Sequence, residues 1–238
     1  MDDLKRYEEL VKTIEYHNDR YYNQDDPEIS DYEYDMMMKE LKKIEKDHPE
    51  YVTPNSPTQH VGGSAKREAG VLVRHRVPML SLQDVFSKEE VQDFVKSMQE
   101  TLVDPVFVVE YKIDGLSMAL RYENGLLTTA ITRGDGIIQG EDVTVNAKVI
   151  KDVKNKLKEP IEYLEVRGEV YMTNEAFDKV NEIQELNNKK TFANPRNCAA
   201  GTLRQLDSRI TKQRNLSMFI FNIQDIRGKE ITSHSQGY

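Results

Sequence analysis

A lysine between two carboxylates is the most chemically suggestive feature of this 238-residue chain. Glu110, Lys112 and Asp114 alternate within residues 107–115, whose period of two predicts a strand with these side chains on one face. Such a lysine is either a salt-bridged surface residue or a nucleophile that bonds to an electrophile such as phosphorus. Attack needs a neutral amine, which carboxylates oppose, so the two acids would orient the amine or hold a metal. The spacing leaves these alternatives open.

Three further segments carry residues that could meet a nucleotide. Arg133 precedes a Gly-Asp-Gly turn, from which its guanidinium could bind a phosphate bidentately. Period-two spacing places Glu165, Arg167 and Glu169 on one face of a strand, which is either solvated or one side of a cleft. Small residues within 192–201 would let a ligand approach the backbone closely. None of these segments is decisive by itself.

Two helices are expected to form a small N-terminal helical hairpin. Apolar spacing predicts the first helix over residues 3–22, and a capping box of Ser30 and Glu33 begins the second, which ends at His48-Pro49. Residues 1–60 carry 8 Lys and Arg against 16 Asp and Glu, whereas the remaining residues carry 25 of each. This charge asymmetry and a Pro- and Gly-containing loop near 52–72 predict a domain boundary there.

The larger module is predicted to be α+β with a largely antiparallel sheet. Asn124-Gly125 lies between two strand-like runs, which is a strong signal for a hairpin. The expected strands besides 107–115 are 116–122, 126–132, 162–171 and 216–223, and the expected helices are 87–102 and about 174–185.

Composition excludes several classes of protein. No apolar run approaches the roughly 20 residues of a membrane helix, and the charged N-terminus is unlike a secretory signal. The single cysteine, Cys198, excludes an internal disulfide framework and reads as a small packed residue. A basic stretch at 188–214 is either a solvated face or a contact for phosphates. We therefore expect a soluble cytoplasmic protein.

Together, KIDG at 112–115, TRGDG at 132–136, EVRGE at 165–169 and FANPRNCAAGTLRQLD at 192–207 closely resemble bacterial NAD-dependent DNA ligases. PMLSL at 78–82 and YYNQDDPEISDYEYD at 21–35 belong to the same resemblance, which extends to about residue 225. It implies a helical module over 1–60 that binds nicotinamide mononucleotide (NMN). It also implies a nucleotidyltransferase-type adenylation domain over 61–238, with an ATP-grasp-like ligase fold.

The resemblance assigns roles position by position. Lys112 would attack the α-phosphate of NAD, release NMN and hold AMP; the full-length enzyme would then pass AMP to the 5′-phosphate of nicked double-stranded DNA during replication and repair. The implied cofactor contacts are Glu110, Ser81 and Leu82 to the adenine side, Arg133 and Glu169 to the ribose, and Tyr21, Tyr22, Asp31, Tyr32, Glu33, Tyr34 and Asp35 to the NMN half. Arg196 and Arg204 would contact DNA phosphates. Tyr34 could instead be an ordinary core residue.

The sequence also departs from the resemblance. The lysine-containing strands that should follow are missing, so a C-terminally incomplete adenylation domain is expected, and the loop 136–142 is about one residue longer than usual. One alternative is an NAD- or NMN-binding remnant without catalysis. Another is an ATP-dependent nucleotidyltransferase, against which residues 21–35 argue. Mg²⁺, or Mn²⁺ in its place, is implied as a cofactor, but the sequence does not identify metal ligands, and no membrane partner is expected.

Overall fold

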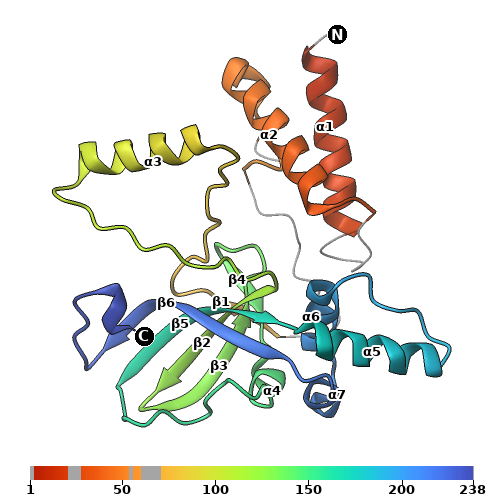
Figure 1. The fold of residues 1–238 in the computed structure, drawn as a ribbon, viewed down its shortest axis with the longest axis vertical. Coiled ribbons are helices and arrows are strands. Elements are labelled where there is room, and N and C mark those ends of the chain that lie inside the picture. The colour runs from red at the N-terminus through yellow and green to blue at the C-terminus, as the bar shows by residue number, and fades with distance from the viewer. Residues whose placement is uncertain (1–2, 21–27, 54–55, 60–70, 238) are drawn as a thin grey trace.

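The computed structural model describes residues 3–20, 28–53, 56–59 and 71–237 (Figure 1). Helices α1 (Asp3–Asn18) and α2 (Asp31–Asp47) pack through a small apolar cluster in which Leu10, Ile14 and Leu41 are buried. The predicted capping box is confirmed, since Ser30 and Glu33 hydrogen-bond each other's backbone N–H groups. A short 3₁₀ helix, Pro49–Tyr51, follows α2 and lies against it.

A four-stranded antiparallel sheet is the centre of the larger module. Its strands are β2 (Leu116–Glu123), β3 (Leu126–Thr132), β5 (Tyr163–Tyr171) and β6 (Ser217–Arg227), in the order β3-β2-β5-β6. The hairpin predicted at Asn124-Gly125 is confirmed: both residues have positive φ, 49° and 77°, as a tight hairpin turn requires. A second small sheet pairs β1 (Leu72–Arg74) with β4 (Gln139–Glu141).

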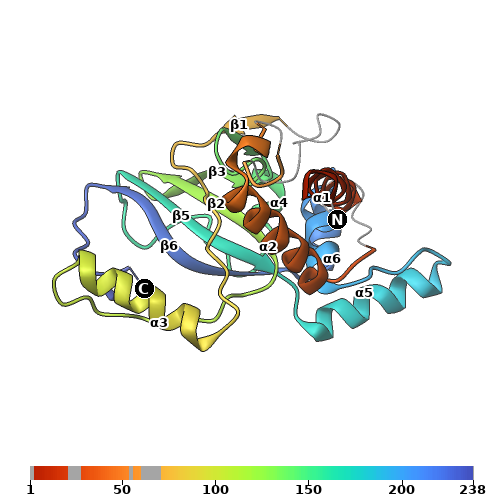
Figure 2. The ribbon, with the colours of Figure 1, turned by 90° about the horizontal axis from the view of Figure 1, so that it is seen from above.

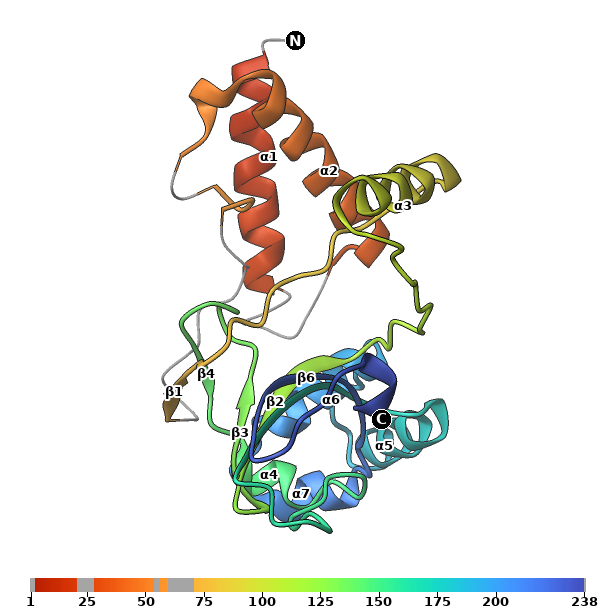
Figure 3. The same cartoon turned by 90° about the vertical axis from the view of Figure 1, so that its left-hand side faces the viewer.

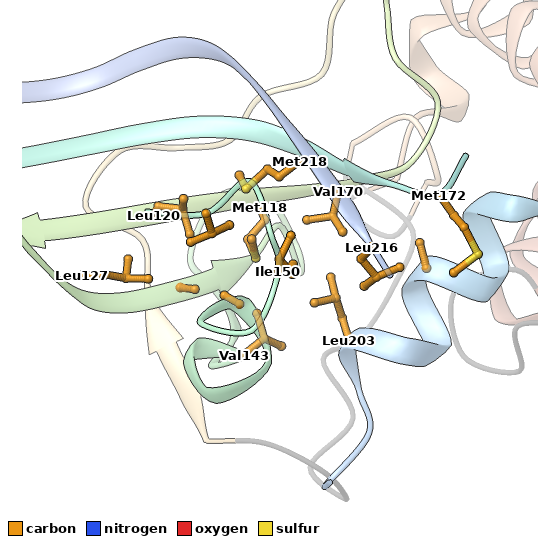
Figure 4. Packing of buried hydrophobic residues seen from close by; sticks show 14 of the residues in the cluster. Met118, Leu120, Leu127, Val143, Ile150, Val170, Met172, Leu203, Leu216 and Met218 are labelled. Carbon is orange, nitrogen blue, oxygen red and sulfur yellow. The ribbon is translucent and has the colours of Figure 1, made fainter. Parts of the chain in front are cut away.

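One face of the four-stranded sheet is apolar and covered by helices. Met118, Leu120, Val166 and Val170 project from this face into the core. Figure 4 shows Leu203 of α6 below Val170 and close to Leu216. The helices of this module are α4 (Thr144–Ala147), α5 (Asn174–Leu186), α6 (Pro195–Leu203) and α7 (Ser208–Gln213). The even-numbered side chains of β2 and β5 lie on this apolar face. The odd-numbered side chains, which include the charged residues of both strands, therefore lie on the opposite face.

The N-terminal helices stand apart from the sheet, and α3 (Lys88–Thr101) lies beside α2 (Figure 3). Lys39 of α2 bonds Glu90, with Nζ 3.3 Å from Oε1, and sits 4.5 Å from the centre of the Phe86 ring. Seen from above, α3 and α5 lie on opposite sides of the molecule (Figure 2). None of the residues of α3 is buried, although the predicted Ser87 cap is present.

The strand predicted over residues 107–115 is wrong. The structure has no strand there, and apolar side chains from both predicted faces are exposed, Val108 by 65% and Val109 by 96%. Alternation of apolar and polar residues predicts a half-buried strand, but such a strand forms only where a neighbouring strand supplies backbone hydrogen bonds. In the described part of the chain, no strand pairs with this segment. The coarser expectation of a mixed α and β fold with antiparallel sheets is confirmed.

Candidate functional site

Glu169 is the centre of a charged cluster on the polar face of the sheet. It lies opposite Ser117 in the pairing of β5 with β2, and the Ser117 hydroxyl hydrogen-bonds its carboxylate. Burial raises the pKa of the Glu169 carboxyl group, against the opposing effects of Arg196, Lys112 and Arg167. Three cations from three different segments therefore lie close enough to act on one carboxylate.

The predicted nucleophile lies just before the sheet begins. Lys112 is exposed, and its neighbours in sequence are engaged elsewhere: Asp114 pairs with Arg196 at 3.4 Å, and Glu110 pairs with His234 at 2.9 Å. The two carboxylates predicted to share a face with Lys112 are thus bound to different partners. Lys112 interacts instead with the carboxylate of Glu169, which lies on β5.

Arg196 is positioned by the first turn of α6. Asn194 caps this helix with its side-chain oxygen 2.8 Å from the backbone nitrogen of Asn197, and Pro195 occupies the first turn. The rest of the helix is anchored because Cys198, Ala199 and Leu203 are fully buried. The predicted DNA contact Arg204 lies at the other end of α6 and pairs with Glu141 at 3.4 Å, whereas Arg196 pairs with Asp114.

A rigid turn presents Arg133. Gly134 and Gly136 have φ of 53° and 75°, which favours glycine, and Asp135 accepts hydrogen bonds from three successive backbone N–H groups. The Arg133 Nε donates to the carbonyl of Met79 at 3.1 Å, and its Nη2 donates to the Ser81 hydroxyl at 2.5 Å. The structure therefore brings together Arg133 and Ser81, both predicted as nucleotide contacts. Leu82 is 72% exposed beside them.

Arg167 was not among the predicted site residues, but the structure places it in the cluster. Its Nε donates to the Ser117 hydroxyl at 3.0 Å and its Nη1 to the Leu80 carbonyl at 2.9 Å. Ser117 therefore contacts both Arg167 and Glu169. The signal that could have found Arg167 was its period-two spacing from Glu169.

The predicted NMN contacts are engaged in different ways. The Tyr34 hydroxyl donates to Asn18 at 2.7 Å and the ring packs against the α1–α2 cluster, while the Glu33 carboxylate belongs to the capping box. Tyr32 is 67% exposed and Asp35 is partly buried. Tyr21, Tyr22 and the side chain of Asp31 lie outside the described residues.

The residues that the structure describes show neither a cluster of metal-ligating side chains nor a membrane-spanning helix. Among them, no group of three or more His, Cys, Asp or Glu side chains could enclose a metal ion. No helix in the described ranges is long and apolar enough to cross a membrane.

Comparisons with known proteins agree over nearly the whole chain. Residues 70–238 match the family model of the NAD-dependent DNA ligase adenylation domain, and residues 1–62 match that of the DNA ligase-like N-terminal NAD+-binding domain. The chain is 57% identical to the DNA ligase of Clostridium kluyveri over 236 residues, which are 99% of this chain and 35% of that protein. It is 54% identical to the DNA ligase of Caldicellulosiruptor saccharolyticus over 234 residues, 98% of this chain and 34% of that protein. The chain thus spans about a third of the length of these relatives.

Proposed function

Because the chain belongs to the family of NAD-dependent DNA ligases, we propose that it carries the adenylation step of such an enzyme, in which Lys112 takes AMP from NAD. The observation that carries the proposal is the interaction of Lys112 with Glu169 in the cluster that also contains Arg167 and Arg196. Phosphoryl and nucleotidyl transfer depend on positioning and on positive charge around the phosphates. The cluster supplies positioning and positive charge beside the primary amine of Lys112.

The proposed step exchanges one bond to phosphorus for another. The neutral Nζ of Lys112 attacks the α-phosphorus of NAD; an N–P bond forms, the P–O bond to the NMN phosphate breaks, and Nζ loses a proton to solvent. Glu169 would bind the ribose and Glu110, Ser81 and Leu82 the adenine side. Arg133 would orient the nucleotide. These roles are supported by Arg133, which holds Ser81, and by Arg167, which contacts both Ser117 opposite Glu169 and the carbonyl of Leu80 next to Ser81.

Residues 1–60 are proposed to bind the NMN half of NAD, and residues 61–238 to form part of a nucleotidyltransferase domain with an ATP-grasp-like fold. Within the first module, exposed Tyr32 is free to stack on a ligand, whereas the ring of Tyr34 supports the helix packing. Transfer of AMP to nicked DNA, with Arg196 and Arg204 on its phosphates, belongs to the longer protein. A cytoplasmic location remains a prediction from the sequence.

Mg²⁺, with Mn²⁺ as a substitute, also remains a prediction. A divalent ion would neutralise phosphate charge when bound. We assign it no step, because the described residues form no cluster of metal ligands.

A binding remnant without catalysis is the second candidate. It is favoured by the exposure of Tyr111, 92%, and by the absence of any strand pairing for residues 107–115 within the described part of the chain. A nucleophile on an unpaired segment is less well positioned than one on a strand. The chain would then bind NAD but would not react with it.

Intact-mass spectrometry after incubation with NAD and Mg²⁺, or with ATP and Mg²⁺, separates these functions. The proposal expects one added AMP with NAD only, its loss in Lys112→Ala, and its retention in Lys148→Ala, which removes an exposed lysine from another segment. Saturable NAD binding without an adduct would support the binding remnant. An adduct with ATP would contradict the NAD assignment.

A further inference from the structure

A small apolar cavity lies between the four-stranded sheet and the loop that joins α4 to β5, which runs below the sheet in Figure 1. Its volume is about 180 Å³, slightly larger than the roughly 150 Å³ of an engineered apolar cavity that binds benzene. The cavity opens to solvent on one side, and its walls include Leu120, Leu164, Val166 and Met218 from the strands and Val153 and Leu157 from the loop. It therefore has room for one aromatic ring, on the face of the sheet opposite Glu169.

Tyr122 adds a single hydroxyl group to the apolar wall. The residue is only 3% exposed, and within the described residues no group forms a hydrogen bond with this hydroxyl. The hydroxyl of Tyr163, by contrast, donates to Glu165 at 2.6 Å. Burial raises the pKa of Tyr122 to about 12, so the group remains a donor at neutral pH. A ligand in the cavity could accept this hydrogen bond.

The loop beside the cavity is strongly basic, although the whole chain has a net charge of −8. Residues 148–158, called the lysine loop below, contain five lysines and one acidic residue, Asp152, which accepts a hydrogen bond from the backbone of Met218 at 3.2 Å. Elsewhere, exposed Lys179 pairs with Glu175 at 2.6 Å. In the part of the chain that the structure describes, none of the loop lysines forms an ion pair, and all five are exposed: Lys148, Lys151, Lys154, Lys156 and Lys158.

The backbone of the lysine loop is fixed to the β2–β3 hairpin. Leu127 donates from its backbone nitrogen to the Asn155 carbonyl at 3.0 Å, and Leu157 donates to the Gly125 carbonyl at 2.8 Å. The side chain of Val153 is buried in the core. Lys154 itself lines the cavity, so positive charge is held at its mouth without any need to order the loop on binding.

We propose that the cavity and the lysine loop form a docking site for an acidic peptide segment of a partner protein, with one aromatic side chain in the cavity and flanking carboxylates on the lysines. The volume of the cavity selects one ring, and the unpaired lysines select several negative charges close to it. A small aromatic acid would supply the ring but only one charge. Duplex DNA would supply many charges but no apolar side chain for the cavity. The site does not depend on the proposed adenylation, because it lies on the other face of the sheet.

Fluorescence anisotropy with matched peptides tests the proposal. The probe is a fluorescein-labelled peptide of Glu and Asp residues with one central Phe, and it should bind saturably and more weakly as ionic strength rises. The same peptide with Ala in place of Phe should bind about tenfold more weakly or worse, because the cavity then stays unfilled. A peptide that keeps the Phe but has Ser in place of the acidic residues should lose most of its affinity.

Variants of the chain locate the site. Leu157→Phe places a ring of the protein's own at the cavity and should reduce the affinity for the Phe peptide to that for the Ala peptide. Replacing Lys154 and Lys156 together by Gln should weaken binding by about threefold or more. The matched control replaces Lys88 and Lys96, two exposed lysines of α3, by Gln and should leave binding unchanged. Thermal unfolding of each variant verifies that it is folded.

Four outcomes would overturn the proposal. Equal binding of the Phe and Ala peptides would show that the lysines attract any polyanion and that the cavity plays no part. Tighter binding of a DNA duplex through the same lysines would make the loop a nucleic-acid contact. Phenylacetate that binds as tightly as the Phe peptide would make the cavity a small-molecule site. Dimerisation of the chain that is lost in the Lys154 and Lys156 double variant would make a second copy the occupant.

Discussion

The ring of His75 hydrogen-bonds the main chain of Arg133, with Nε2 2.8 Å from the carbonyl oxygen. A carbonyl can only accept, so Nε2 carries the proton. The backbone nitrogen of His75 donates to the Ile138 carbonyl at 2.9 Å, and that of Met79 donates to Gly136 at 2.7 Å. Residues 75–79 and the turn that carries Arg133 are thus joined at both ends, and His75, 8% exposed, supports the turn from inside.

Replacing His75 should therefore disturb Arg133 more than it disturbs the fold. His75→Phe removes the donor from a partly buried carbonyl, and we expect AMP binding to weaken by about five- to tenfold. His75→Gln can place an amide N–H near the position of Nε2 and should restore most of the affinity. Calorimetry with AMP measures both variants, and thermal unfolding controls for general damage. Equal loss in the Phe and Gln variants would show that the ring's packing, and not its hydrogen bond, is what matters.

The buried carboxylate of Glu169 should lower the stability of the folded protein at neutral pH. Since burial raises its folded-state pKa above the unfolded value of about 4.3, the protonated form is favoured on folding. Its contribution to stability is present below the unfolded pKa and is lost as pH rises through the folded pKa. We expect Glu169→Gln to unfold at a higher temperature than wild type at pH 7, with the difference shrinking in acid, and to take up less AMP.

Glu159→Gln is the matched control for that experiment. Lys229, 2.8 Å away, lowers the pKa of Glu159, so the ionised form is the one favoured by folding. Removing this exposed charge should leave the unfolding temperature unchanged or slightly lower at pH 7. A gain in stability in both variants would point to the reduced net negative charge of the chain, and not to the burial of Glu169.

Local signals in the sequence predicted local structure well. Ser30 and Glu33 specify a helix start by their own hydrogen bonds, and Asn124-Gly125 specifies a turn by its backbone conformation. Residues 107–115 failed because a strand also needs a partner, which alternation within one segment cannot report. The motifs indicated Lys112 and Glu169, whereas Arg167 and His75 act through contacts with residues distant in sequence. Spacing places Arg167 on the same face as Glu169, but it cannot give the partners that Arg167 and His75 find in distant segments of the chain.

Cys198 should be chemically inert in the folded protein. The side chain is fully buried on α6, and burial raises the pKa of the thiol to about 11. Because the thiolate is the reactive form and a free cysteine has a pKa of about 8.5, alkylation at pH 8 should be at least about 100-fold slower than for a small thiol. Iodoacetamide labelling followed by mass spectrometry measures this rate, and addition of urea should restore fast labelling. Fast labelling without denaturant would mean that α6 opens readily from the core.

In the ion pair of Arg121 with Glu165, each charge should be needed to balance the other in the folded protein, and neither should take part in nucleotide chemistry. Both side chains are nearly inaccessible, 7% and 0% exposed, and the Tyr163 hydroxyl also donates to Glu165 at 2.6 Å. Glu165→Leu leaves an uncompensated buried guanidinium and should cost about 3–5 kcal/mol of unfolding free energy. The double variant Arg121→Met with Glu165→Leu removes both charges and should recover most of that loss. Urea unfolding of the two single variants and the double variant gives the coupling energy, because each single change removes the same interaction. A double variant that is as unstable as the sum of the single changes would mean that the pair is not coupled.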